Sequence, residues 1–223
     1  MSCDYTDPDT WWDEYQAHYG RRSSRDYRPL LAEVVGHGLE GPLLDVGAGY
    51  GFLVECARRF GIAAIGVEGS PNAVSICRER HPLADIRFWR AGTDLPVESS
   101  TIGVVVANEF IDHITPDQNA LLFKEVYRVL KPEGILLVKS PSRHNSFDDD
   151  LGHVSFFSPS EFSAFVRSFS FKILSQPYIP QPLLGNTRLG HLAMGIVSRF
   201  YRPEKWAARI DLVAQKAVLE ELS

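Results

Sequence analysis

The sequence has few cysteines, no long apolar run and no excess of basic residues. Cys3, Cys56 and Cys77 are odd in number and widely separated, which indicates neither a disulfide framework nor a zinc site. No apolar run approaches the roughly 20 residues of a membrane-spanning helix. The net charge of -5 lacks the basic excess with which tight nucleic-acid binders neutralise phosphates, although a local basic patch stays open. These absences disfavour a membrane or a nucleic acid as partner.

The composition is that of an ordinary globular protein. Of the 223 residues, 44% are hydrophobic and 23% are charged, which predicts one domain with a sizeable core. Residues 1–8 are acidic and lack the basic and apolar signature of a secretory signal, so we expect a cytoplasmic location.

A glycine-rich segment follows a short apolar stretch near residue 45. Leu43 and Leu44 lead into Asp45, and glycines follow at positions 47, 49 and 51, before a segment with helical apolar spacing. This pattern predicts a buried strand, a tight turn and a helix N-terminus, where bare backbone N–H groups favour an electron-rich ligand. A dinucleotide fingerprint needs its third glycine one position later, so the spacing argues against NAD.

Three further motifs follow this segment along the chain. They are Gly66 to Ser70, Val104 to His113 and Arg128 to Gly134. Together with Leu43 to Gly51, they resemble the motifs of class I S-adenosylmethionine-dependent methyltransferases over roughly residues 40 to 140. The resemblance implies S-adenosylmethionine as cofactor. It also implies a doubly wound α/β fold with a seven-stranded, mostly parallel sheet and an antiparallel last strand between the fifth and sixth strands.

Apolar patterns predict alternating strands and helices along one domain, 1–223. We expect lid helices within 1–38, a cofactor-binding core at 39–140 and an acceptor side at 141–223, where the connection 181–205 could wall the pocket or form a homodimer surface. The predicted strands are 43–46, 62–68, 85–90, 102–107, 134–139, 171–178 and 209–214. The predicted helices include 11–19, 27–35, 116–130, 161–168 and 189–200.

Acidic residues at the tips of the first two strands suit the cofactor. The Glu68 carboxylate can accept hydrogen bonds from both ribose hydroxyls, and the alternative is a helix-capping or solvent-facing acid. Asp45 would anchor the glycine turn or the methionine amino group. The expected cofactor-binding set is Asp45, Gly47, Ala48, Gly49, Tyr50, Glu68, Gly69, Gly92, Thr93, Asp94, Asn108 and Tyr15.

The sequence leaves two questions about this set open: which group binds adenine, and whether Tyr15 reaches the cofactor. The family's adenine-binding acid aligns with Ala91, so either Asp94 replaces it or the backbone of Gly92 and Thr93 holds adenine together with apolar stacking. The aromatic helix 11–19 either packs on the domain or closes over the cofactor. In the second case Tyr15 or Tyr19 would touch the methionine carboxylate, as the resemblance implies.

Methyl transfer from a sulfonium depends mainly on orienting donor and acceptor, and it needs a base only when the acceptor arrives protonated. His113, after the fourth strand, is a candidate base or a structural histidine. His153 could face the acceptor or be packed. His144, Asp148 to Asp150 and His153 show no recognised ligand spacing, so we predict no metal.

These features predict an enzyme that transfers a methyl group to a small-molecule acceptor. Asn108-Glu109-Phe110 lacks the Asn/Asp-Pro-Pro-aromatic signature of DNA amino-methylating enzymes. The alternative is a non-catalytic, S-adenosylmethionine-binding regulatory or partner subunit, because fold does not fix function.

Overall fold

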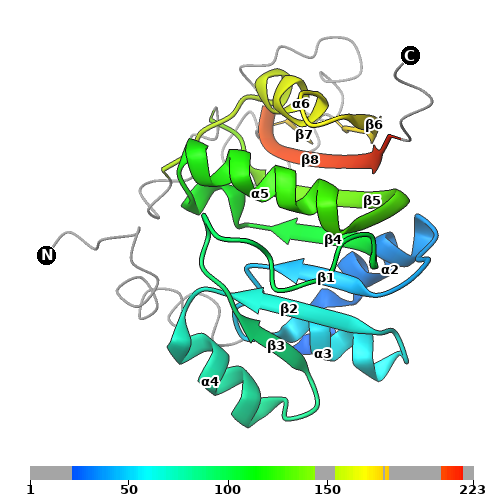
Figure 1. Cartoon of the computed structure of the whole chain (residues 1–223), viewed down its shortest axis with the longest axis vertical. Helices are drawn as coiled ribbons and strands as arrows, with labels where there is room; N and C mark the ends of the chain where they lie inside the picture. Colours follow the sequence, from blue (N-terminus) through cyan, green and yellow to red (C-terminus); the bar gives the residue numbers. More distant parts are fainter. Residues whose placement is uncertain (1–21, 144–153, 178, 181–206, 218–223) are drawn as a thin grey trace, which may run out of the picture.

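The computed structural model describes residues 22–143, 154–177, 179–180 and 207–217, whose strands form one sheet (Figure 1). The sheet has the order β3-β2-β1-β4-β5-β8-β6, with β7 paired to β8. Strands β1 to β5 are parallel, and β8 runs antiparallel to both β5 and β6, as predicted. The strands are β1 (Leu43–Val46), β2 (Ala64–Glu68), β3 (Asp85–Phe88), β4 (Ile102–Asn108), β5 (Leu130–Pro141), β6 (Phe171–Ser175), β7 (Ile179–Pro180) and β8 (Ala207–Lys216).

Helices cover both faces of this sheet. Ser70, Thr115 and Ser158 cap the N-termini of α4, α5 and α6 by accepting a backbone N–H bond, and a proline follows each cap. The helices are η1 (Ser24–Tyr27), α2 (Arg28–Gly36), α3 (Phe52–Arg59), α4 (Pro71–Arg80), η2 (Ile111–His113), α5 (Pro116–Val129) and α6 (Pro159–Arg167).

Alternate residues of the central strands belong to two separate hydrophobic cores, one on each face of the sheet. Leu43 packs with α2 and α3, whereas its neighbour Leu44 packs in the cluster that contains α5 and α6. Successive strand residues point to opposite faces, so a continuous apolar run indicates a strand that is buried on both sides. The helices therefore form two layers, with α2, α3 and α4 on one face of the sheet and α5 and α6 on the other. The candidate site lies at the ends of the strands.

Some predicted boundaries were wrong by a few residues. β5 begins at Leu130 rather than Gly134, because Leu130 pairs with Ile102 before the register shifts. Pro132 and Gly134 are typical of a turn, so the sequence pattern conceals this bulged start. β3 and β6 end before their predicted limits, and α6 begins at Pro159, two residues earlier than predicted.

Several predicted features lie outside the described residues. They are the helices 11–19 and 189–200 and the connection 181–205, so the lid and the homodimer surface stay predictions. Within the described part of the chain, no helix combines the length and apolar character needed to span a membrane.

Candidate functional site

The glycine turn after β1 runs directly into α3. Gly47, Gly49 and Gly51 all have positive φ, in the region that favours glycine. The backbone N–H groups of Gly47 and Ala48 both donate to the Val67 carbonyl at 3.0 Å, which ties the turn to β2. The turn therefore lies packed against the tips of the first two strands.

The Glu68 carboxylate lies between this turn and the start of α4. Its Oε2 accepts a hydrogen bond from the Gly49 N–H at 2.8 Å, and its Oε1 accepts one from the Ser70 N–H at 2.9 Å. A carboxylate has about four acceptor positions, so it can also accept a hydroxyl donor. The predicted acid is thus held at the tip of β2 and is not solvent-facing.

Asp45 is a second carboxylate at the same place, and it is 6% exposed. Burial raises its pKa to about 7, and the neighbouring Glu68 charge adds to this increase. Burial also raises the pKa of Glu68, against the backbone hydrogen bonds from Ser70, Gly49 and Gly69 that lower it. Two neighbouring acids, of which Asp45 is buried and Glu68 half-buried, favour a cationic or hydrogen-bond-donating ligand, since such a ligand would offset the desolvation of their charges.

Two side chains hold the loop after β3, which contains the candidate adenine-binding residues. The Trp89 indole donates to the Thr93 carbonyl at 3.0 Å, and the Gln118 amide donates to the Ala91 carbonyl at 3.2 Å. Gly92, Thr93 and Asp94 are exposed, and Gly92 has a φ of 95°. Neither contact distinguishes Asp94 from the backbone as the adenine-binding group.

The tip of β4 meets the glycine turn through an aromatic ring. A Cβ added to Gly47 would lie 2.3 Å from Cδ2 of Phe110, so only glycine fits beneath this ring. Phe110 also contacts the Trp89 ring, with centroids 6.1 Å apart. The residue just before this tip, Asn108, is half-buried. The predicted residues Gly47, after β1, and Asn108, at the end of β4, therefore lie at the same edge of the sheet.

His113 belongs to a buried polar network. Its Nε2 lies 3.5 Å from Oδ2 of Asp112, whose Oδ1 accepts a hydrogen bond from the Ser140 hydroxyl at 3.0 Å. The Asp112 carbonyl accepts the N–H groups of Val154 and Ser155. This network joins η2, β5 and the segment before α6. These contacts suit the structural alternative for His113, and base catalysis by it stays a prediction.

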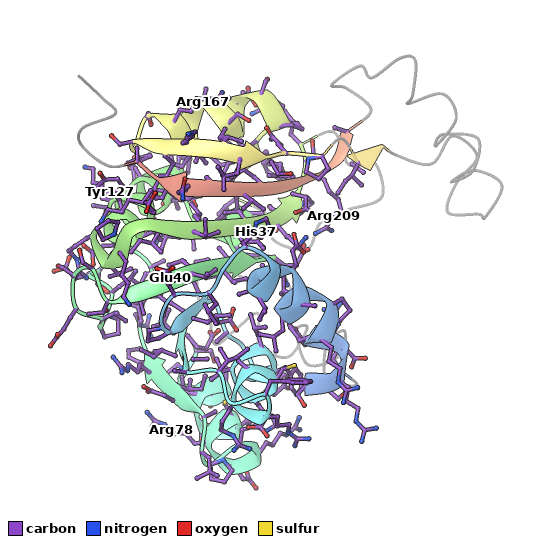
Figure 2. The ribbon with its side chains drawn as sticks, turned by 90° about the vertical axis from the view of Figure 1, so that its right-hand side faces the viewer. His37, Glu40, Arg78, Tyr127, Arg167 and Arg209 are labelled. Carbon is purple, nitrogen blue, oxygen red and sulfur yellow. The ribbon has the colours of Figure 1, made fainter. Side chains whose placement is uncertain are left out.

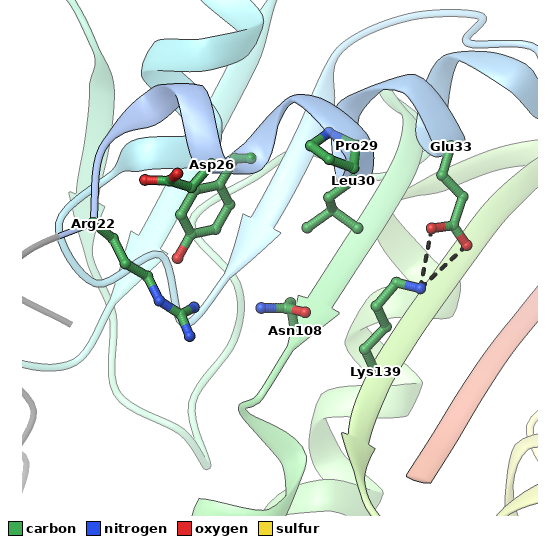
Figure 3. A pocket seen from close by; sticks show the side chains of 8 residues that line it. Arg22, Asp26, Pro29, Leu30, Glu33, Asn108 and Lys139 are labelled. Atoms are coloured by element: carbon green, nitrogen blue, oxygen red, sulfur yellow. Dashed lines mark hydrogen bonds and ion pairs between the residues drawn. The ribbon is translucent and has the colours of Figure 1, made fainter. Parts of the chain in front are cut away.

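A cavity of about 430 Å³ lies between α2 and the ends of β4 and β5 (Figure 3). Lys139 lies on its wall, with Nζ 3.0 Å from a Glu33 oxygen and 2.7 Å from Oδ2 of Asp211. Figure 3 shows Arg22 across the cavity from Lys139, with Asn108 between them. The lining residues are Arg22, Asp26, Tyr27, Pro29, Leu30, Glu33, Asn108 and Lys139.

A third ion pair joins Arg209 of β8 to Glu109, the residue that follows Asn108 of the cavity wall. The predicted site residues do not include Lys139, Asp211, Glu109 or Arg209. The sequence does contain a signal for Lys139 and Asp211, because each is a charged residue directly beside buried apolar strand residues. Figure 2 shows Arg209 and Tyr127 near opposite ends of β8, which locates the Glu109–Arg209 pair at the start of that strand.

Three predicted groups lie outside the described residues: Tyr15, His153 and the acidic run 148–150. Within the described ranges, no three His, Cys, Asp or Glu side chains are grouped so that they could hold a metal ion. The roles of Tyr15 and His153 stay predictions.

Comparison with known proteins agrees with this geometry. Residues 44–138 match the family model of a methyltransferase domain. A probable S-adenosylmethionine-dependent methyltransferase of Mycolicibacterium smegmatis is 32% identical over 130 residues, which are 56% of this chain and 46% of that protein. A SAM-dependent methyltransferase from Archaeoglobus fulgidus has a similar fold, with a TM-score of 0.69 and 16% identity, covering 92% of this chain and 99% of that one.

Other relatives act on different classes of acceptor. The mitochondrial ubiquinone biosynthesis O-methyltransferase of Mus musculus is 28% identical over 152 residues, 60% of this chain and 40% of that protein. The tRNA N(3)-methylcytidine methyltransferase of Schizosaccharomyces pombe is 24% identical over 163 residues, 62% and 51% of the two chains. The chain spans about half or less of the length of these curated relatives.

Proposed function

Since the chain belongs to the class I S-adenosylmethionine-dependent methyltransferases, we propose that it transfers a methyl group from that cofactor to a small-molecule acceptor. The observation that carries this proposal is the Glu68 carboxylate, which lies beside buried Asp45 and accepts the N–H groups of Gly49 and Ser70. Two neighbouring carboxylates suit a cationic ligand that also carries hydroxyl groups.

The residues divide by the part of the cofactor that each would hold. Glu68 accepts the ribose hydroxyls, and Asp45 offsets the charge of the methionine ammonium group. Adenine lies on the loop after β3, held by Asp94 or by the backbone of Gly92 and Thr93. When bound, the cofactor supplies a methyl group on a sulfonium, already activated for displacement. The backbone of Gly47, Ala48, Gly49, Tyr50 and Gly69, with Asn108 and Tyr15, completes the proposed contacts.

The cavity supports a small acceptor over a nucleic acid. Its volume of about 430 Å³ suits a drug-sized molecule. The net charge of -5 opposes the phosphate backbone of an acceptor such as the tRNA of the fission-yeast relative. A tRNA that is methylated faster than every small molecule in a broad panel would contradict this part of the proposal.

Binding and turnover test the proposal separately. Calorimetry with S-adenosylmethionine and with its demethylated product should show one site. A panel of hydroxyl, amine, thiol and activated-carbon acceptors, followed by detection of demethylated cofactor, should then reveal turnover. Binding without turnover, together with a co-purified protein partner, would favour the non-catalytic alternative. Absence of cofactor binding would contradict both functions.

The base, where the acceptor needs one, is a separate part of the proposal. His153 is the candidate that the sequence favours, at the start of the segment before α6. His113 is the second candidate, although its ring lies against Asp112. Replacing each histidine and comparing turnover with cofactor affinity distinguishes a base from a structural residue.

A further inference from the structure

The face of the sheet that α2 covers changes from apolar to charged at one end. Leu137 of β5 pairs with Val213 of β8, and both are buried. One step along the same face, Lys139 pairs with Asp211, and the next pair places Arg209 opposite Pro141. Partly buried ion pairs add little stability compared with apolar residues, so these charges suit recognition better than packing.

The two cations at this end differ in their surroundings. Lys139 is held between two carboxylates, Glu33 at 3.0 Å and Asp211 at 2.7 Å, and its side chain is 19% exposed. Arg209 is paired with Glu109, and its side chain is 37% exposed. A partly exposed ion pair is weaker than a fully buried one, so an incoming anion can replace Glu109 on the guanidinium. Arg209 is the better anion receptor of the two.

Glu109 follows Asn108 of the cavity wall at the tip of β4. Its φ of 53° lies in the left-handed region, which few residues other than glycine adopt. Its N–H donates to the Lys139 carbonyl at 2.8 Å, which fixes this turn against β5. Backbone strain of this kind concentrates at functional sites. The turn directs the carboxylate toward β8, where it pairs with Arg209.

We propose that Arg209 binds a carboxylate of the methyl acceptor and that Glu109, displaced from Arg209, accepts the proton of the acceptor's hydroxyl group. This inference rests on the proposed function and names its substrate class, a small hydroxy acid. The hydroxyl oxygen forms a bond to the methyl carbon as the carbon–sulfur bond breaks, and that electron pair stays on sulfur. The hydroxyl proton passes to Glu109, so for this class of acceptor Arg209 is the anchor and Glu109, in place of His153 or His113, is the base.

Two probes of similar size test the anchor: 3,4-dihydroxybenzoate, which carries a carboxylate, and catechol, which does not. Calorimetry on the full chain with demethylated cofactor should show a preference for 3,4-dihydroxybenzoate. Arg209→Met should weaken its binding about tenfold or more and leave catechol unchanged. Arg87→Met is the matched control, because Arg87 is also paired with an acid and 39% exposed but lies on β3.

Glu109→Gln should change the affinity for 3,4-dihydroxybenzoate in the opposite direction to Arg209→Met. It therefore tests the proposal even if Arg209→Met fails to fold. Removing the competing carboxylate frees the guanidinium, so binding of 3,4-dihydroxybenzoate should tighten while its methylation slows about tenfold or more. A merely structural ion pair would weaken binding in both variants or change neither. That result, or a wild-type protein that binds the demethylated cofactor without preferring 3,4-dihydroxybenzoate, overturns the inference. Absence of cofactor binding instead contradicts the proposed function on which the inference rests.

Discussion

Replacing Asp45 with asparagine should stabilise the ligand-free protein at neutral and alkaline pH. Burial raises the pKa of this carboxyl from 3.8 to about 7. A carboxyl with a raised pKa binds its proton more tightly in the folded than in the unfolded chain. The free energy of unfolding therefore falls as the pH rises from about 4 to about 7, and this contribution stays level above pH 7.

The size of this effect follows from the pKa shift. A rise of about three pKa units means that ionised Asp45 lowers the free energy of unfolding by about 4 kcal/mol. Asparagine removes the charge, but its buried amide costs about 1–3 kcal/mol when it lacks a partner. We expect a net gain of about 1–3 kcal/mol at pH 8, with a rise in Tm of about 2–4 °C per kcal/mol for a chain of this size.

Urea unfolding of the wild type and Asp45→Asn at pH 4, 6 and 8 measures this difference. The advantage of the variant should grow between pH 4 and 7 and then stay constant, and its affinity for S-adenosylmethionine should fall. Glu98→Gln, which changes an exposed carboxylate, is the matched control variant. A variant that loses the same stability at pH 4 and pH 8 would refute the reasoning, because Asp45 would then stabilise the turn itself.

Three further predictions concern the cofactor site and the acceptor. Glu68→Gln should lower cofactor affinity about tenfold or more in calorimetry, since it removes a charge-assisted acceptor, whereas unchanged affinity would exclude the ribose role. Gly51→Ala should cost about 2 kcal/mol more in urea unfolding than Gly61→Ala. Both glycines have positive φ, but a Cβ at Gly51 lies 2.4 Å from the Cys77 sulfur and one at Gly61 meets open space. Equal losses of stability in the two variants would show that the positive φ alone, and not the contact with Cys77, determines the cost. His153→Ala should lower turnover more than cofactor affinity if it serves the acceptor, and turnover at the wild-type rate would leave it a packed residue.

Much of the sheet could be predicted from local patterns, because burial on both faces demands apolar runs. Leu43 and Leu44 belong to different cores, which explains why the strand has no polar alternation. The position of Glu68 at a strand tip also follows from the run before it. Local sequence therefore locates the cofactor acid, since strand, turn and acid are adjacent along the chain.

The charged contacts beside the cavity could not be predicted in the same way. Glu109 and Arg209 are 100 positions apart, and Lys139 and Asp211 are 72 apart. Their pairing depends on β8 entering between β5 and β6 in one register, which spacing alone does not specify. A lysine after four buried apolar residues was nevertheless a usable signal, because a strand seldom carries a cation there without a partner.

The central position of β8 has a consequence for how the chain is made. Residues 207–216 leave the ribosome after β5 and β6, yet they must enter between those two strands. Until then, β5 and β6 each expose an unpaired edge that can recruit another chain. The nascent protein therefore depends on β8, the latest-synthesised of the described strands, to protect it from aggregation, and premature termination before residue 207 would leave both edges open.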